Sequence, residues 1–266
     1  MLGEVPASSL HDDAPLYERP MAQPETLADQ EIQLAPPDGI EEDLIDLLMS
    51  PQWATSQYDS QLFLNTVVGP GSDAAVLRLK HPTSGADTGR GIALTTDGNH
   101  RWCAVNPRIG AAMTVAESVL NLACVGAIPQ ALVNCLNFGN PENPSVMWQL
   151  SEAVDGMAEA CTAFELPVVG GNVSLYNESQ GKNIDPTPIV GVIGLIDDLA
   201  KPPPGLAWND GDRIILLGPE ANALDGSAWA FKNGYRGGSL EPIDFDLHQR
   251  VCALTRDLVT KELVHM

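Results

Sequence analysis

Residues 167–178 read Pro-Val-Val-Gly-Gly-Asn-Val-Ser-Leu-Tyr-Asn-Glu, an apolar run that leads into two glycines and then into small polar side chains. This pattern predicts a strand with a possible ligand contact at its end. The glycines let an anion approach the backbone N–H groups, and Asn172 and Ser174 offer compact polar contacts. A Gly-Gly pair after a strand is more often a plain turn or bulge, so the stretch alone leaves both interpretations open.

The segments around this stretch alternate between strand and helix patterns. Alternating or continuous apolar runs predict strands, and apolar residues at intervals of three and four predict helices. The order β-β-β-α-β-α-β-β predicts an α+β fold, a mixed sheet with helices on one face. The expected strands are Gln61–Val68, Ala74–Lys80, Arg90–Thr96, Ile128–Phe138, the stretch from Val168 and Pro188–Ile196; the expected helices are Pro107–Ala127 and Asn143–Glu165.

The flanking regions suggest three parts. Residues 1–57 are rich in proline and acids, which predicts an arm or linker, with a short helix at Glu41–Met49 that buries its leucines and isoleucine. Residues 58–200 are expected to form the main α+β domain. Residues 201–266 are expected to begin a second α/β domain after a proline-rich linker, with a strand at Asp212–Leu217 and helices after Ser227 and from Leu247.

Composition narrows the function classes. The 266 residues carry a net charge of -21 with only 14 Lys plus Arg, so an anionic nucleic acid or membrane surface would repel the chain. No apolar run approaches the roughly 18 residues of a membrane span. Five scattered cysteines without C-x-x-C spacing and no visible secretory signal predict a reduced, cytoplasmic setting.

Four polar clusters at predicted element ends are candidates for a site. Two are acids beside strands, Asp73 and Asp97, although an Asp near glycine is a turn in most proteins. Glu117 and Asn121 are four residues apart on one predicted helical face and could share a cation, or the Glu could bond to core backbone donors. The fourth, residues 134–142, is rich in amides that turn and cap chemistry would also explain.

Several motifs for common chemistries are missing from the sequence. The five histidines are scattered without ligand spacing, which indicates surface positions. No G-x-S-x-G, P-loop or H-E-x-x-H motif occurs, which removes the simplest support for a serine hydrolase, a P-loop NTPase or a zincin. No catalytic base is assigned to any residue.

Taken together, five motifs resemble phosphoribosylformylglycinamidine synthase, synthetase subunit, in its small form. They are Gly-Pro-Gly-Ser-Asp-Ala-Ala-Val at 69–76, Thr-Asp-Gly-Asn at 96–99, Leu-Asn-Phe-Gly-Asn-Pro-Glu at 136–142, Gly-Gly-Asn-Val-Ser-Leu-Tyr-Asn-Glu at 170–178 and Pro-Thr-Pro-Ile-Val-Gly at 186–191. The resemblance implies an AIR-synthase-like domain, the second ATP-binding copy of a larger enzyme of which this chain is a piece.

In that family the full subunit converts formylglycinamide ribonucleotide, ATP and ammonia to the amidine, ADP and phosphate. The ammonia comes from a glutaminase subunit, and a small bridging subunit and the first ATP-binding copy are the other implied partners. By position, the resemblance implies that Gly171 and Asn134 contact ATP, Asn172 ligates Mg²⁺ and Ser174 contacts the substrate. Glu117 and Asn121 resemble the pair that, in the large form, helps to hold Mg²⁺ at an auxiliary nucleotide site, and Asp97 is a further candidate metal residue.

The sequence departs from the family pattern at three positions. Asn134 replaces a usual Asp, which removes a charge but keeps an isosteric oxygen. Leu120 stands where Arg is frequent, and Ala228 where an acid often follows the serine matched by Ser227. Two alternatives therefore stay open: a non-catalytic structural nucleotide-binding domain, and a related ATP-dependent phosphotransferase of the same superfamily. We also expect Asn172, Glu117 and Asn121 to converge.

Overall fold

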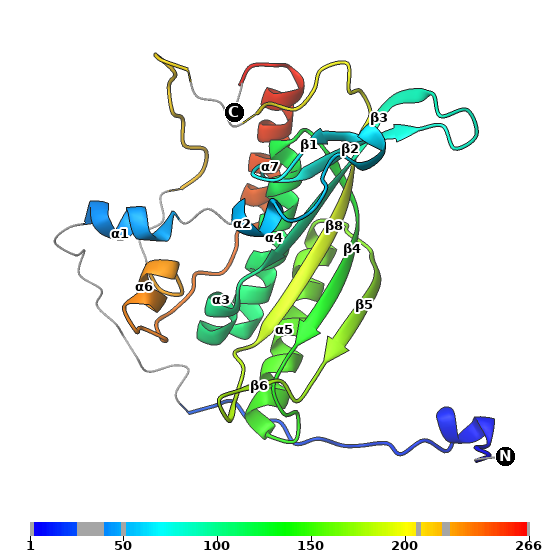
Figure 1. Cartoon of the computed structure of the whole chain (residues 1–266). Coiled ribbons are helices and arrows are strands. Elements are labelled where there is room, and N and C mark those ends of the chain that lie inside the picture. Colours follow the sequence, from blue (N-terminus) through cyan, green and yellow to red (C-terminus); the bar gives the residue numbers. More distant parts are fainter. Residues whose placement is uncertain (1–2, 26–39, 49–51, 206–208, 220–223, 265–266) are drawn as a thin grey trace.

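The computed structural model describes residues 3–25, 40–48, 52–205, 209–219 and 224–264 (Figure 1). Its centre is a six-stranded sheet in the order β1-β2-β3-β8-β4-β5. The strands are β1 (Thr66–Val68), β2 (Ala75–Lys80), β3 (Asp87–Gly98), β4 (Ile128–Asn137), β5 (Val168–Ser174) and β8 (Thr187–Ile196). Only β4 and β5 pair in parallel, so the sheet is mixed, as the sequence predicts.

Helices α4 (Pro107–Cys124) and α5 (Pro144–Ala163) cover one face of this sheet, which confirms the predicted α+β layer (Figure 1). Both begin at an asparagine cap followed by proline, since Asn106 and Asn143 accept the free N–H groups of the first turn. α4 contacts β3, β8 and β4. Its Val115 and Leu122 are fully buried, as is Leu132 of β4.

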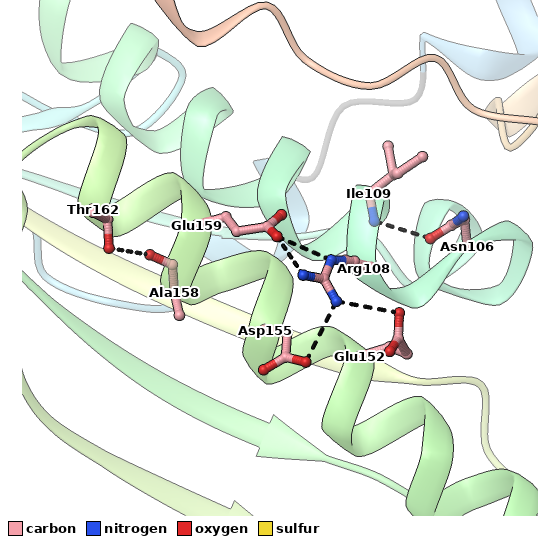
Figure 2. Close-up of polar contacts among 8 residues, drawn as sticks. All are labelled: Asn106, Arg108, Ile109, Glu152, Asp155, Ala158, Glu159 and Thr162. Carbon is pink, nitrogen blue, oxygen red and sulfur yellow. Dashed lines mark hydrogen bonds and ion pairs between the residues drawn. The ribbon is translucent and has the colours of Figure 1, made fainter. Parts of the chain in front are cut away.

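The contact between α4 and α5 is unusually close at Gly156. A Cβ there would lie 2.0 Å from the backbone oxygen of Arg108, so only glycine lets the two backbones meet. Figure 2 shows a polar clamp between the same two helices, in which the Arg108 guanidinium faces three acids of α5. Arg108 bonds Glu159 through Nε at 3.1 Å and lies 3.4 Å from Asp155 and 3.7 Å from Glu152.

The remaining elements lie around this two-layer core. α3 (His100–Val105) joins β3 to α4, and β6 (Glu178–Ser179) and β7 (Lys182–Asn183) form a small hairpin before β8. α7 (Phe245–Thr260) packs on α4, where His248 Nε2 bonds the Ala116 oxygen at 2.9 Å. The others are α1 (Ile40–Leu47), α2 (Gln52–Thr55), α6 (Ala228–Lys232) and the 3-10 turns η1 (Ala7–Leu10) and η2 (Leu62–Leu64).

The second face of the sheet and the strand β5 are largely open. Along β8 the residues alternate between buried and half-buried, so that Val190 and Val192 face the helices. On the opposite face Val133 is 46% exposed and Leu94 40% exposed. β5 is an edge strand whose residues are all exposed except half-buried Ser174.

Several sequence predictions are wrong in detail. The strand expected at Gln61–Val68 begins only at Thr66, because Phe63 and Leu64 have positive φ angles of 61° and 54° and form η2 instead. The strand expected at Asp212–Leu217 is irregular, since no described segment pairs with it. The leucines expected to be buried in the helix at 41–49 are largely exposed, Leu44 at 50% and Leu48 at 79%; Met49 lies outside the described residues.

Two further corrections concern the helices and the histidines. α3 was not expected, and α7 begins at Phe245 and ends at Thr260 rather than running to the end of the chain. His100 and His248 are half-buried rather than surface residues, because each packs against an aromatic ring. In the part of the chain that is described, no helix has the length and hydropathy to cross a bilayer.

Candidate functional site

The predicted site residues lie toward one edge of the sheet. β3 and β4 are both antiparallel to β8, and β5 is parallel to β4, so the carboxyl ends of β3, β4 and β5 share this edge. Asp97 stands near the end of β3, and Ser174 ends β5. The order of the strands therefore brings together segments that are far apart in the sequence.

Asn134 and Gly171 are direct neighbours on β4 and β5. They are register partners, and a Cβ on Gly171 would lie 2.1 Å from Asn134 Oδ1. The side chain of Asn134 thus occupies the space that a side chain at position 171 would need. This contact gives a structural reason for glycine here, independent of any ligand.

Asn172 and Ser174 lie on the opposite, open face, because side chains alternate along a strand. Asn172 is exposed, and its amide Nδ2 has only a weak contact of 3.9 Å with Cys135 Sγ. Ser174 belongs to a turn network in which Asn177 Nδ2 donates to the Ser174 oxygen at 2.9 Å and to the Phe138 oxygen at 3.0 Å. Asn172 is therefore available to a ligand, while Ser174 is already part of a hydrogen-bonded turn.

A second group of polar side chains lies between β3 and α4. Asp97 accepts hydrogen bonds from Ser118 Oγ at 2.5 Å and from Asn121 Nδ2 at 2.9 Å. Glu117 is half-buried beside them and has no hydrogen bond or ion pair among the described residues. Glu117 and Asn121 share one face of α4, as the sequence predicts, and their neighbour is Asp97.

Burial governs the charges of these two acids. It raises the pKa of Asp97, although the hydrogen bonds from Ser118 and Asn121 oppose the rise. The Thr95 hydroxyl also opposes the rise, although it forms no hydrogen bond with a described residue. Burial raises the pKa of Glu117 as well, the negative charge of Asp97 adds to the rise and Arg101 opposes it. Two poorly solvated carboxylates that repel each other favour a bound cation.

These residues fit a magnesium ion. Carboxylate and amide oxygens are the ligands that Mg²⁺ prefers, and Asp97, Glu117 and Asn121 supply both kinds. Across the described ranges, no three His, Cys, Asp or Glu side chains gather to hold a metal ion, so the set depends on the asparagine amide. Asp73, the other predicted acid, is exposed just before β2.

The two groups do not converge, which corrects one expectation. β3 and β5 are separated by β8 and β4, and at about 4.8 Å per strand this puts roughly 14 Å between them. Asn172 also faces away from the helices, whereas Glu117 and Asn121 belong to α4. Because helical spacing fixes only one face of one helix, it could not reveal this separation.

Sequence reasoning missed three basic residues at the same edge. His100 and Arg101 open α3 directly after the cluster at 96–99, and Arg236 follows α6. The pKa of His100 is lowered by burial and by the positive charge of Arg101, while Asp185 opposes the shift. The position of His100 and Arg101 next to Asp97 was a signal that could have found them; nothing local pointed to Arg236.

Comparison with known proteins identifies the class first. Residues 71–196 match the family model described as AIR synthase related protein, N-terminal domain, so this part of the chain is a domain of that family. The match covers β2, β3, β4, β5 and β8 with both covering helices, so the sheet and the two polar groups at its edge all belong to this domain.

The chain is also similar to curated PurL subunits. It is 41% identical over 274 residues to phosphoribosylformylglycinamidine synthase subunit PurL of Moorella thermoacetica, an alignment that covers 99% of this chain and 36% of that protein. It is 42% identical over 256 residues to the same subunit of Parafrankia sp., covering 91% and 32%. The chain thus spans about a third of the length of these curated relatives.

Solved structures agree with this assignment. The structure of PurLQS from Thermotoga maritima matches with a TM-score of 0.53 and 34% identity, over 62% of this chain and 28% of that one. T. maritima PurL complexed with ATP and T. maritima PurL complexed with FGAR each match with a TM-score of 0.50 and 35% identity. Each match covers 58% of this chain and 24% of the other chain.

Proposed function

We propose that this chain is part of an ATP-dependent carbon–nitrogen ligase of purine biosynthesis. The whole enzyme would convert formylglycinamide ribonucleotide and ammonia to formylglycinamidine ribonucleotide, with ATP giving ADP and phosphate. The observation that carries the proposal is the 41% identity to PurL across 99% of the chain. The chain would supply half of the nucleotide and substrate cleft, as its second ATP-binding copy.

The residues of this half-site would have different binding roles. Phosphoryl transfer to the amide oxygen of the substrate, followed by displacement of phosphate by ammonia, depends mainly on positioning and electrostatics. The backbone N–H of Gly171 and the amide of Asn134 would contact ATP, Ser174 would contact the substrate, and exposed Asn172 would offer its oxygen to Mg²⁺. When bound, Mg²⁺ would neutralise phosphate charge.

Asp97, Glu117 and Asn121 would form a separate, auxiliary Mg²⁺–nucleotide site. Support comes from the two half-buried carboxylates and the free state of Glu117. The proposed site lies on the helix side of the sheet, whereas Asn172 is on the open side, so one ion would not serve both groups. We therefore assign Asn172 to the active site and the Asp97 group to the auxiliary one.

The proposed partners are a glutaminase subunit that delivers ammonia, a small bridging subunit and the first ATP-binding copy. One matching structure is named PurLQS from Thermotoga maritima, which supports the proposal of partner subunits. The open sheet face, with Val133 and Leu94 exposed, is a suitable surface for the first copy. All five cysteines are free, which is consistent with a reduced cytoplasmic setting.

A second candidate is a non-catalytic domain that holds nucleotide for structural reasons. Asn134 in place of the usual Asp favours it, because a neutral amide cannot replace a carboxylate wherever charge is needed. Under this alternative nucleotide would bind, but the assembled enzyme would turn over without using the edge at Asn172.

Thermal shift with Mg·ATP tests the proposal, on the whole chain alone and with the first ATP-binding copy of a relative added. We expect stabilisation that is smaller in Asn172→Ala, where only the auxiliary site still binds, and unchanged in Asn233→Ala, an asparagine at the end of α6. No shift in either setting would contradict nucleotide binding. Turnover of formylglycinamide ribonucleotide by the chain alone would contradict the half-site. Full activity of an assembly that carries Asn172→Ala would favour the structural alternative.

A further inference from the structure

Three basic side chains gather beyond the carboxyl end of β3 in a chain of net charge -21. The ring of Phe231 brings two of them together: the His100 ring meets it edge-on at 5.3 Å, and the Arg236 guanidinium carbon lies 3.6 Å from its centre. The positive charge of Arg101 also acts on His100. The acid nearby is Asp185, 3.7 Å from Arg236.

Arg101 is exceptional among the arginines of the domain. Arg78, Arg90 and Arg108 each pair with a carboxylate at 2.6 Å or in a network. Arg101 forms no ion pair with a described carboxylate, and its Nε is buried without a hydrogen-bond acceptor. The Nε of Arg78 is buried in the same way, but the Arg78 guanidinium still bonds Asp87 through Nη1. A guanidinium donor that is taken out of water and left unpaired costs free energy unless an anion completes it.

Glu117 is an acid near Arg101 that also lacks an ion pair among the described residues. Glu117 interacts electrostatically with Arg101, yet the two do not form an ion pair, and each is half-buried. The carboxylates and the guanidinium are thus neighbours that do not pair directly. A metal ion on the carboxylates and a phosphate on the guanidinium would give alternating charges, as in metal–nucleotide sites.

The other side of Arg101 is closed. Residues 226–236 cover it, and the cavity that Arg101 and Arg236 line there is about 10 Å³, room for about one water molecule. A phosphate group could not enter on that side without displacing α6. The side toward Glu117 is therefore the one from which an anion would reach Arg101.

We propose that Arg101, flanked by His100 and Arg236, binds a phosphate group of a nucleotide whose magnesium ion is held by Asp97 and Glu117. The inference rests on the auxiliary site of the proposed function and adds the residue that recognises the anion. The planar guanidinium of Arg101 can donate two parallel hydrogen bonds to a phosphate, which a lysine at this position would contact less well. Arg101 is thus a binding residue for the diphosphate, and Arg236 adds positive charge.

Calorimetric titration of the whole chain with Mg·ADP tests this role. We expect at least about tenfold weaker binding in Arg101→Gln, since one charge-assisted pair is lost. Arg256→Gln is the matched control: Arg256 is also half-buried and forms no ion pair among the described residues, but it lies by the pocket at the opposite end of the sheet. Its affinity should stay within about twofold of the parent.

Two additions keep the result interpretable. Arg101→Lys retains the charge if Arg101→Gln does not fold, and should bind more weakly than the parent. Magnesium pyrophosphate serves as a probe without a nucleoside. If Mg·ADP binds equally to the parent, Arg101→Gln and Arg101→Lys, the inference is overturned while nucleotide binding stands. If only pyrophosphate binds and Arg101→Gln abolishes it, the anion site stands and the nucleotide function fails. If the parent binds neither probe, the inference is overturned.

Discussion

The contact between Gly171 and Asn134 predicts that Gly171→Ala lowers the free energy of unfolding of the parent, but not that of the Asn134→Ala variant. A double-mutant cycle measures this difference. A Cβ added at Gly171 would lie 2.1 Å from Asn134 Oδ1 and 3.0 Å from its Cγ, and 3.2 Å from its backbone oxygen. Gly171 has no positive φ, so the backbone itself accepts alanine. The obstacle is therefore the side chain of Asn134, which can be removed separately.

The expected magnitudes follow from two opposing effects. Overpacking against Asn134 should cost about 1–3 kcal/mol of the free energy of unfolding in Gly171→Ala. Alanine recovers about 0.5–1 kcal/mol of the conformational entropy cost of glycine in a strand. In the Asn134→Ala background only this gain and a tight contact with the backbone oxygen remain. The same substitution should therefore destabilise the parent and leave the Asn134→Ala variant unchanged or slightly more stable.

Urea unfolding followed by the fluorescence of the five tryptophans measures the cycle. Gly170→Ala is the matched control, because its Cβ would meet only Val133 Cγ1, at an ordinary 3.7 Å. An equal loss of stability from Gly171→Ala in both backgrounds would refute the reasoning, since the cost would then come from the backbone and not from Asn134. A changed m-value would show that the denatured state had altered instead.

Further predictions concern the helix layer and the buried charges. Gly156→Ala should cost about 3 kcal/mol or more, because the obstructing atom is backbone oxygen and the helices must separate; an unchanged melting temperature would contradict the contact. Arg108→Gln should cost only about 0.5–1 kcal/mol, and less at high salt, because the clamp is partly exposed; a salt-independent loss would argue for packing. The raised pKa values of Asp97 and Glu117 mean that stability is lost as pH rises through them. Glu117→Gln should therefore flatten the pH dependence of melting without metal, and an unaltered slope would count against the repulsion. Burial raises the pKa of Cys103 to about 12, so this thiol should resist a disulfide reagent at pH 8 until the chain unfolds.

Local patterns were enough to predict the central elements. β4, α5 and β8 follow from apolar periodicity and from the Asn-Pro start of α5, since these signals are contained within each segment. α3 was missed because six residues offer too little periodicity to separate a helix from a turn. The strand at Asp212–Leu217 failed for the opposite reason, since its apolar pattern is good but strand pairing needs a neighbour.

The site was predictable only as far as its residues share one element. Glu117 and Asn121 are correctly placed on one side of α4, because four residues span one turn. Their distance from Asn172 depends on the strand order, in which β8 is inserted between β3 and β4, and no local signal reports that insertion. Arg101 lies close to Asp97 in the sequence, but its lack of an ion pair among the described residues is visible only in the structure.

The open edge of β5 has a practical consequence for the isolated chain. Its sequence, Val-Val-Gly-Gly-Asn-Val-Ser, contains none of the lysines or prolines that usually block strand addition, and Val169 is 66% exposed. Two copies could therefore pair edge to edge. At low ionic strength the net charge of -21 holds copies apart, and added salt screens that repulsion. Self-association in solution should consequently increase with salt, so dilute, low-salt buffers should keep the chain monomeric.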